Sequence, residues 1–334
     1  MTASYLRETY LSSAVESHRV GPERFSLWSR RYAGTVVGAD DYGWAIDRLA
    51  EANAEQSEQR AEVGHAGPAR RVKGESELRE WVEGTIASAA ERLAASAALD
   101  VSGLPAIVVR TMDDTTGGQA YYSPGSEDGD HPATIWIGAG GGPHQVEYFK
   151  TVVLHESTPG HHIEASYQRR ASTLSRFQRL VYIPGHSEGW GLYAERLANE
   201  VGLLDTPRER LGFRGSQALR LVSLLIDVGM HTDMEPPTAL RPCVGDRWSI
   251  EGAIRLVAAQ GLDQPTAEYW VTNMAGRPGH RASYVAGERA WLDARAESSR
   301  RGETLHAFHS RMLGMGPLGL DEMRLRSTRG TKDN

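Results

Sequence analysis

Residues 155–162, which read His-Glu-Ser-Thr-Pro-Gly-His-His, constrain this chain more than any other segment. Three histidines and a glutamate fall within these eight residues, and a Pro-Gly pair interrupts the backbone between them. Neutral imidazole is the commonest side-chain ligand of zinc, and a neighbouring carboxylate can act as the base on a water molecule that the metal activates. The segment therefore predicts a metal site built around a broken helix.

The spacing of these histidines does not suit one straight helix. In the HExxH helix of zinc hydrolases, the two histidines are one turn apart and face the same ion. Here His161 and His162 follow His155 by six and seven positions. On an unbroken helix the first would point away from His155, and the second would lie about 10 Å along the axis. Proline at 159 disrupts the helix, so we expect a kink that folds a downstream histidine back.

We expect His161 to be the second ligand, because a histidine directly after the glycine of the break can mimic the one-turn approach. His162 would then support the ligands or face the substrate, and these two histidines could exchange roles. The alternative without a metal is a helix end with surface histidines. The clustering of four such groups disfavours it.

A zinc site needs a third protein ligand, and the segment 187–195 is the best source. Glu188 and Glu195 fall on one face of the helix expected there. A lone helix carboxylate is usually solvated, but the preceding His-Glu signal favours Glu188, which stands at the helix start beside two glycines that allow close approach. Glu195 could orient a ligand histidine from behind, and it is also an alternative ligand.

Residues 277–284 form a turn that enters a helix and offer His280, Arg281 and Tyr284 as hydrogen-bond donors. Zinc hydrolases often use a Tyr or His donor to stabilise the developing oxyanion. The sequence does not choose among these residues, and His280 is also a candidate for a ligand or for a group that supports the ligands. His231 follows a long apolar helix, and on its own it would be taken as structural.

The rest of the chain predicts a mainly helical fold with two regions. Residues 1–100 form a helical N-terminal region in which Tyr42–Glu62 and Glu75–Leu99 have helical periodicity. Residues 101–334 form the region that holds the chemistry. Gly and Pro clusters punctuate its start, ahead of the helix that carries the first histidine.

Two β-branched runs, Ile107–Val109 and Ala133–Ile137, predict a small hairpin or a two-stranded edge before the metal-binding helix. The glycines of residues 138–142 predict a turn rather than a phosphate loop, because no Lys-Ser/Thr pair follows. Val146, Phe149 and Val153 then form the buried stripe of the metal-binding helix.

Composition excludes several classes of protein. A net charge of −6 argues against a nucleic-acid binder, which should carry a basic face. The single cysteine, Cys243, permits no internal disulfide, and we expect it to be a small packed residue rather than a catalytic thiol. Residues 1–20 do not resemble a signal peptide, and no stretch reaches the apolar length of a bilayer span. We therefore expect a cytoplasmic protein with neither a nucleic acid nor a membrane as partner.

From about Thr111 onward, the chain resembles the bacterial family of unknown function numbered 885. The resemblance rests on short blocks that occur in the family's order, namely Tyr121-Tyr122, His155–His162, Glu188–Glu195, Asp227–His231, Pro278–Tyr284 and Phe308–Leu313. Each block is short, but their joint order is highly specific. In the last block, leucine stands one place later than in the family pattern.

The resemblance implies a mainly helical, zinc-metallopeptidase-like fold that is related to gluzincins and shares the general plan of the thimet-oligopeptidase kind. It also implies that His231 and Tyr284 are donors facing the metal. The family usually has Gln in place of His280, so the pocket would present a different group to substrate. Family members carry more helical sequence ahead of the matched part. The shortened N-terminal region implies a more open cleft, or one completed by a second subunit of a homo-oligomer.

We therefore expect a zinc-dependent hydrolase that cleaves an amide bond in a peptide or a small amino-acid conjugate. The expected ligands of Zn²⁺ are His155, His161 and Glu188. Glu156 would be the general base, with Tyr284 and His231 as oxyanion donors. Another divalent transition metal suits the same ligands. Two alternatives stay open: hydrolysis of another C–N bond in a small metabolite, and a metal-binding relative without catalysis.

Overall fold

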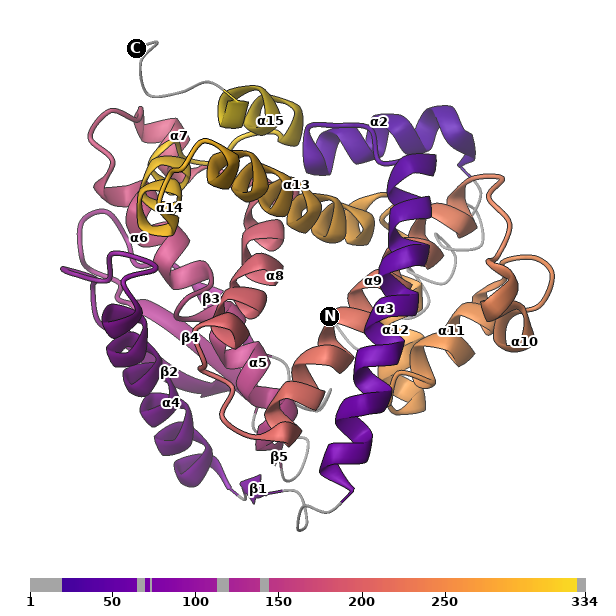
Figure 1. Ribbon diagram of the computed structural model, residues 1–334, viewed down its shortest axis with the longest axis horizontal. Coiled ribbons are helices and arrows are strands. Elements are labelled where there is room, and N and C mark those ends of the chain that lie inside the picture. Colours follow the sequence, from indigo (N-terminus) through magenta and orange to yellow (C-terminus); the bar gives the residue numbers. More distant parts are fainter. Residues whose placement is uncertain (1–19, 65–69, 73, 113–119, 139–143, 329–334) are drawn as a thin grey trace.

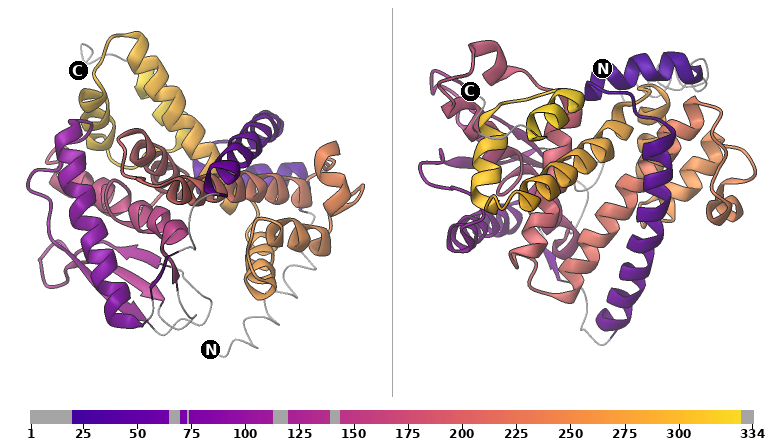
Figure 2. Two further views of the ribbon diagram at one scale, coloured as in Figure 1. Left: turned by 60° about the horizontal axis from the view of Figure 1, so that its bottom comes forward. Right: turned by 45° about the horizontal axis from the view of Figure 1, so that its top comes forward.

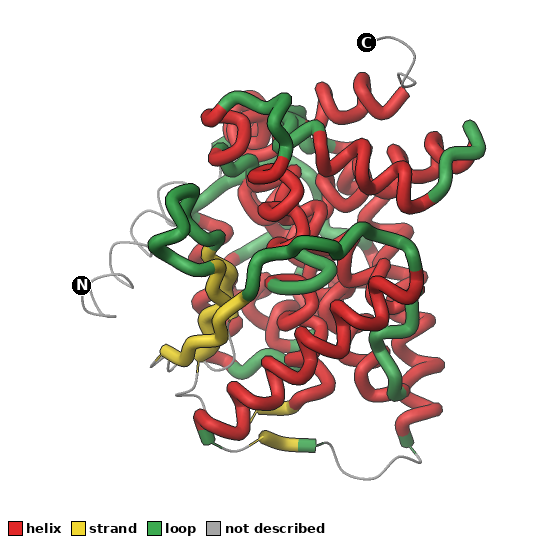
Figure 3. The backbone as a smooth tube through the Cα atoms, turned by 90° about the vertical axis from the view of Figure 1, so that its left-hand side faces the viewer, coloured by secondary structure: helices red, strands yellow, loops and turns green. Residues whose placement is uncertain are grey.

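The computed structural model describes residues 20–64, 70–72, 74–112, 120–138 and 144–328. These residues form a mainly helical protein with a small sheet, as expected (Figures 1 and 3). The helices are α2 (Gly21–Ala33), α3 (Ala39–Val63), α4 (Glu75–Ser96), α5 (Val146–Glu156), α6 (His161–Arg170), α7 (Arg176–Leu180), α8 (Pro184–Glu200), α9 (Pro207–His231), α10 (Arg241–Val244), α11 (Ile250–Ala258), α12 (Gln264–Ala275), α13 (His280–Arg300), α14 (Leu305–Gly314) and α15 (Leu320–Thr328), with a short 3-10 turn at Thr238–Leu240.

The sheet differs from the expected hairpin. β2 (Ile107–Met112) and β4 (Ala133–Gly138) lie side by side in parallel, and β3 (Ala120–Ser123) pairs antiparallel with the far edge of β4. The prediction of a hairpin between the two β-branched runs is therefore wrong, because the chain between them is long enough to reverse twice and to supply a third strand. A second, two-stranded pair joins β1 (Arg71–Val72) to β5 (His144–Gln145).

The two helices expected in the N-terminal region are confirmed as α3 and α4, and most of the buried side chains of each lie in a different apolar cluster. α3 packs along α9, and its buried side chains join the largest apolar cluster, which α8, α9 and α13 also build (Figure 2). α4 packs on α5 and on β2, beside a second cluster that includes Phe149 and Val153 of the predicted stripe. The boundary near residue 100 stays a prediction, and the glycines of residues 139–142 lie outside the described part of the chain.

No helix among the described residues is both long and apolar enough to cross a lipid bilayer.

His309, from the last of the family blocks, ties α14 to the core. It is fully buried, with Nδ1 2.8 Å from the carbonyl oxygen of Ala98 and Nε2 2.7 Å from the hydroxyl of Tyr193. The carbonyl can only accept, so Nδ1–H donates to it and the tyrosine hydroxyl donates to Nε2. Burial lowers the pKa of His309 to about 4, and the nearby positive charge of Arg295 adds to this effect.

We therefore expect His309 to make stability depend on pH in the mildly acidic range. Its pKa rises from about 4 in the folded protein to 6.5 in the unfolded chain, so the unfolded state takes up the proton first. The contribution is complete above pH 6.5 and declines to about pH 4, by at most about 3 kcal/mol. Urea unfolding of wild type and His309→Gln between pH 4 and 7.5 measures this difference. If the free energy of unfolding changed equally with pH in the two proteins, this expectation would be contradicted. His131→Gln, at an exposed site, serves as the control.

Candidate metal centre

Residues 155–162 contain the end of one helix, a sharp turn and the start of the next helix. α5 ends at Glu156 and α6 begins at His161, so the expected break is present. The N–H of Gly160 donates to the carbonyl of Leu154 at 3.0 Å, and the indole N–H of Trp190 donates to the carbonyl of Gly160 at 3.0 Å. A Cβ at position 160 would lie 1.7 Å from the carbonyl oxygen of His155. Only glycine therefore lets the chain turn back so closely on α5.

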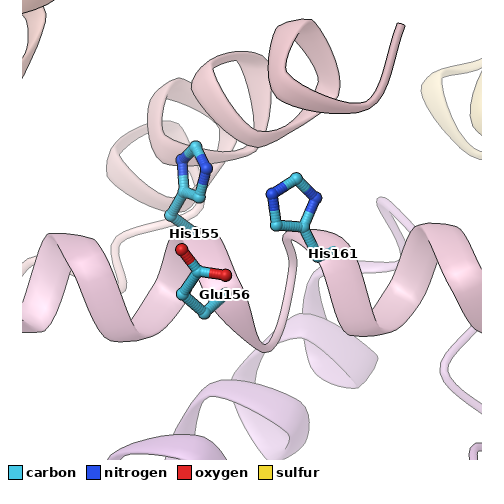
Figure 4. Close-up of side chains that lie close together, drawn as sticks. All are labelled: His155, Glu156 and His161. Atoms are coloured by element: carbon cyan, nitrogen blue, oxygen red, sulfur yellow. The ribbon is translucent and has the colours of Figure 1, made fainter. Parts of the chain in front are cut away.

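The turn brings His161 beside His155. Their ring centroids are 4.8 Å apart, with the rings nearly perpendicular. Each of His155, Glu156 and His161 offers a ligand atom within 4.8 Å of those of the other two. Figure 4 shows the two imidazoles on either side of the break and the Glu156 carboxylate next to His155. His161 thus lies where its position after the glycine predicted.

Glu188, at the start of α8, faces both imidazoles with one oxygen. Its Oε2 lies 3.5 Å from Nε2 of His155 and 3.9 Å from Nε2 of His161. One turn of α8 away, a Cβ at Gly191 would lie 2.4 Å from the ring of His155. This glycine is what allows α8 to approach the histidine so closely, and one of the two glycines noted beside Glu188 thus has the expected role.

Each of the two histidines is held by a second carboxylate through its other nitrogen. Nδ1–H of His155 donates to Oε1 of the buried Glu195 at 2.8 Å, and Nδ1–H of His161 faces Oε2 of the buried Glu164 at 3.4 Å. A carboxylate in its charged form can only accept, so each Nδ1 carries a hydrogen and the two Nε2 atoms are the ones that face Glu188. Glu195 thus contacts the nitrogen of His155 that does not face Glu188, and its role in supporting a metal ligand stays a prediction.

Glu164 is a residue of this site that no motif singled out, although its spacing gave a signal. Glu164 follows His161 by three positions, a spacing that puts two side chains on one helix face. Its Oε1 also accepts hydrogen bonds from Gln168 at 3.0 Å and from the hydroxyl of Ser187 at 2.8 Å. Glu195 is fixed in the same way, by the hydroxyl of Ser216 at 3.1 Å and the amide of Gln217 at 3.2 Å. Both supporting carboxylates are thus immobilised by polar neighbours.

The carboxylates make this cluster favour positive charge. Burial opposes protonation of His155, but hydrogen bonds to Glu188 and Glu195 raise its pKa to about 10. Burial likewise opposes ionisation of Glu188, yet the two imidazoles hold its pKa well below the usual range. A buried site that stabilises positive charge so strongly suits a bound cation.

The donor set and its spacing fit a divalent transition metal. Zinc bonds to nitrogen and oxygen are about 2.0–2.2 Å long, so adjacent ligand atoms of a tetrahedral site lie roughly 3.4 Å apart. The separations of 3.5 and 3.9 Å between Glu188 Oε2 and the two Nε2 atoms are near this value. His155, His161 and Glu188 could therefore hold such an ion with little movement.

Glu156 lies close to His155 and His161, but the carboxylates that are paired with these histidines are Glu195 and Glu164. The Oε2 of Glu156 accepts the backbone N–H of Tyr122, on strand β3, at 2.9 Å. Burial raises the pKa of Glu156, although the neighbouring His161 and His155 oppose the shift. A carboxylate whose pKa is moved toward neutrality is better matched to general-base work.

His162 is engaged elsewhere. Its Nε2–H donates to the carbonyl of Pro105 at 3.0 Å, and its Nδ1 lies 3.1 Å from the hydroxyl of Tyr122. With both nitrogens occupied, His162 is a poor candidate for a ligand. The geometry therefore favours His161 over His162.

Two tyrosines, Tyr182 and Tyr284, interact with Glu188. The hydroxyl of Tyr182 donates to Oε1 of Glu188 at 2.6 Å. Burial, and then the charge of Glu188, raise the pKa of the buried Tyr284, so both phenols stay protonated. Tyr182 precedes α8 in a segment with no motif, and nothing in the sequence singled it out. His280 packs edge-on against Tyr284, with ring centroids 5.4 Å apart, and its pKa is lowered to about 4 by burial and by Arg281.

His231 contacts Phe25 and Met274, which are not part of the candidate metal centre. It is fully buried, its ring stacks on Phe25, and its Nε2–H donates to the carbonyl of Met274 at 3.1 Å. One turn earlier, Asp227 accepts the backbone N–H groups of Gly279 and Ala282 at 2.9 Å each, which fixes the start of α13 and so the position of Tyr284. The donor role of His231 stays a prediction.

These elements belong to a known class of bacterial sequence. Over residues 1–326 the chain matches the family described as "Bacterial protein of unknown function (DUF885)", and it belongs to that family. The match extends the resemblance over the N-terminal region as well. A comparison with curated proteins found no match.

Two solved structures share the fold. The chain superimposes on a protein named as a candidate lipoprotein from Colwellia psychrerythraea with a TM-score of 0.79 at 20% identity, covering 92% of this chain and 56% of that one. A candidate lipoprotein of unknown function from Shewanella oneidensis gives a TM-score of 0.75 at 18% identity, with 94% and 60% covered. The chain thus spans somewhat over half the length of these proteins. The cytoplasmic location expected from the sequence stays a prediction.

The geometry predicts which substitutions abolish metal binding. We expect purified wild type to hold about one equivalent of zinc, and His155→Ala, His161→Ala and Glu188→Ala to lose it, because each removes a direct ligand. His162→Ala should keep the metal and serves as the matched control. Elemental analysis after dialysis measures the content. Retention in His161→Ala together with loss in His162→Ala would reverse the assignment of the second histidine.

Proposed function

We propose that this protein is a metal-dependent hydrolase that cleaves an amide bond in a peptide or a small amino-acid conjugate. The observation that carries the proposal is the position of Glu156, a half-buried carboxylate close to His155 and His161, which together with Glu188 could hold one ion. Such a neighbouring carboxylate, in addition to the ligands, is what a hydrolase needs and a purely structural metal site does not.

The residues that would hold Zn²⁺ are His155, His161 and Glu188, with Glu195 and Glu164 orienting the two imidazoles. Zinc in that position would act as a Lewis acid, polarising a carbonyl group and lowering the pKa of water toward neutrality. The gluzincin-related architecture belongs to this proposal. Its support is that the third ligand comes from a second helix packed against the helix of the first.

The side chains around the set divide the remaining work. Glu156 takes the proton from the attacking water and passes it to the leaving amine, and the N–H of Tyr122 holds its carboxylate in place. Tyr284, protonated at neutral pH, is the donor toward the oxygen that becomes negative. Tyr182 uses its one hydroxyl proton on Glu188 and so holds that ligand in place.

Glu156→Gln separates the base from the ligands. The variant keeps the shape of the side chain and should keep its zinc, but it cannot accept a proton, so we expect turnover to fall by about 10²–10⁴-fold. The measurement is hydrolysis of a panel of peptides and N-acylated amino acids, with zinc content determined in parallel. Activity equal to wild type would exclude Glu156 as the base. Zinc binding by wild type without hydrolysis of any panel member would exclude the hydrolase itself.

A further inference from the structure

Two arginines lie against the same pair of aromatic rings next to the candidate metal centre. Arg220 comes from α9 and Arg281 from the first turn of α13. The guanidinium carbon of Arg220 lies 5.1 Å from the ring centroid of Trp270 and 5.7 Å from that of Tyr284. The corresponding distances of Arg281 are 4.4 and 5.3 Å. The two cations therefore flank one aromatic platform.

Neither arginine forms an ion pair with a carboxylate in the part of the chain that the structure describes. Both side chains are partly buried, and the Nε of each is shielded from solvent without a hydrogen bond. Among the described residues, no carboxylate lies within ion-pair distance of either guanidinium, whereas the partly buried Arg196 is paired with Glu288. Placing two like charges close together in a partly desolvated position is unfavourable unless an anion joins them.

The platform places these cations close to the site of the proposed reaction. Tyr284, which contacts both guanidinium groups through its ring, also interacts with Glu188, the third ligand, whose charge acts on its hydroxyl. Arg220 also experiences the charges of Glu195 and Glu188, although it contacts neither. One tyrosine side chain thus connects the guanidinium groups to the ligand set. This arrangement suits an N-acylated amino acid, because its carboxylate carbon is only two bonds from the nitrogen of the amide that would be cleaved.

We propose that Arg220 and Arg281 bind the free α-carboxylate of the substrate, so that the enzyme releases a C-terminal amino acid from a short peptide or an N-acyl amino acid. This inference rests on the proposed hydrolase and narrows its substrate class. In the reaction the amide C–N bond breaks, a C–O bond to water forms, and the proton that Glu156 takes from water goes to the departing amino group. Planar guanidinium groups suit this task because they bind a carboxylate through two parallel hydrogen bonds.

A purely electrostatic role is the competing explanation. In that case the arginines would only offset the charges of Glu188, Glu195 and Glu156, and the protein would not distinguish an acid from its amide. The two explanations therefore differ in ligand binding, which can be measured without turnover.

The test uses N-acetyl-phenylalanine and its carboxamide as probes, titrated by calorimetry into Glu156→Gln protein with and without zinc. We expect the acid to bind at least about tenfold more tightly than the amide in both forms. Arg220→Gln and Arg281→Gln, each added to Glu156→Gln, should weaken binding of the acid about tenfold or more and leave the amide unchanged. Arg79→Gln, at an exposed site on α4, is the matched control.

Equal affinity for acid and amide in Glu156→Gln protein would overturn the proposal even if an arginine variant failed to fold. A preference for the acid that survives both arginine substitutions would also overturn it. These outcomes are distinct from failure of the hydrolase, which the activity panel of the wild type detects. An acid preference in zinc-free protein, lost with either arginine, would support the carboxylate site whatever the reaction proves to be.

Discussion

The close approach of two imidazoles across a broken helix is the interaction on which the rest of the site depends. A straight helix would separate His155 from His161, and the turn through Gly160 brings their rings to 4.8 Å. That approach requires glycine at position 160, in the turn between α5 and α6, and at position 191, on the facing helix α8, because a Cβ at either position would overlap His155. The helices α5, α6 and α8 can then present two nitrogens to one oxygen of Glu188.

The surrounding protein makes this arrangement tolerable by supplying partners for buried charge. Glu195 and Glu164 are almost fully buried, and each accepts hydrogen bonds from a hydroxyl and an amide in addition to an imidazole. A buried carboxylate without such partners would be strongly destabilising. The resulting excess of negative charge raises the pKa of His155 to about 10, which shows how strongly the site attracts a positive charge. Protons or a metal cation can satisfy it.

Short sequence patterns predicted the features of the site that depend on one segment. Features that depend on contacts between distant segments could not be predicted. Proline at 159, with the glycine after it, was enough to predict the break and the return of a downstream histidine toward His155, because both follow from helix geometry. The order of β2, β3 and β4 was not predictable, because a short β-branched run does not specify its neighbour or its direction. Tyr182 was not predicted because it precedes α8 in a segment without a motif. The pairing of Arg281 with Arg220 was not predicted because Arg220 comes from α9, an element distant in sequence. Glu164 could have been found from its spacing to His161.

The most direct test of this account is a crystal of the protein grown with zinc and measured at the zinc absorption edge. The account predicts one anomalous peak within bonding distance of Nε2 of His155, Nε2 of His161 and a carboxylate oxygen of Glu188, with Glu156 nearby and not bound. A peak at His162 instead of His161, or no peak between α5, α6 and α8, would contradict it.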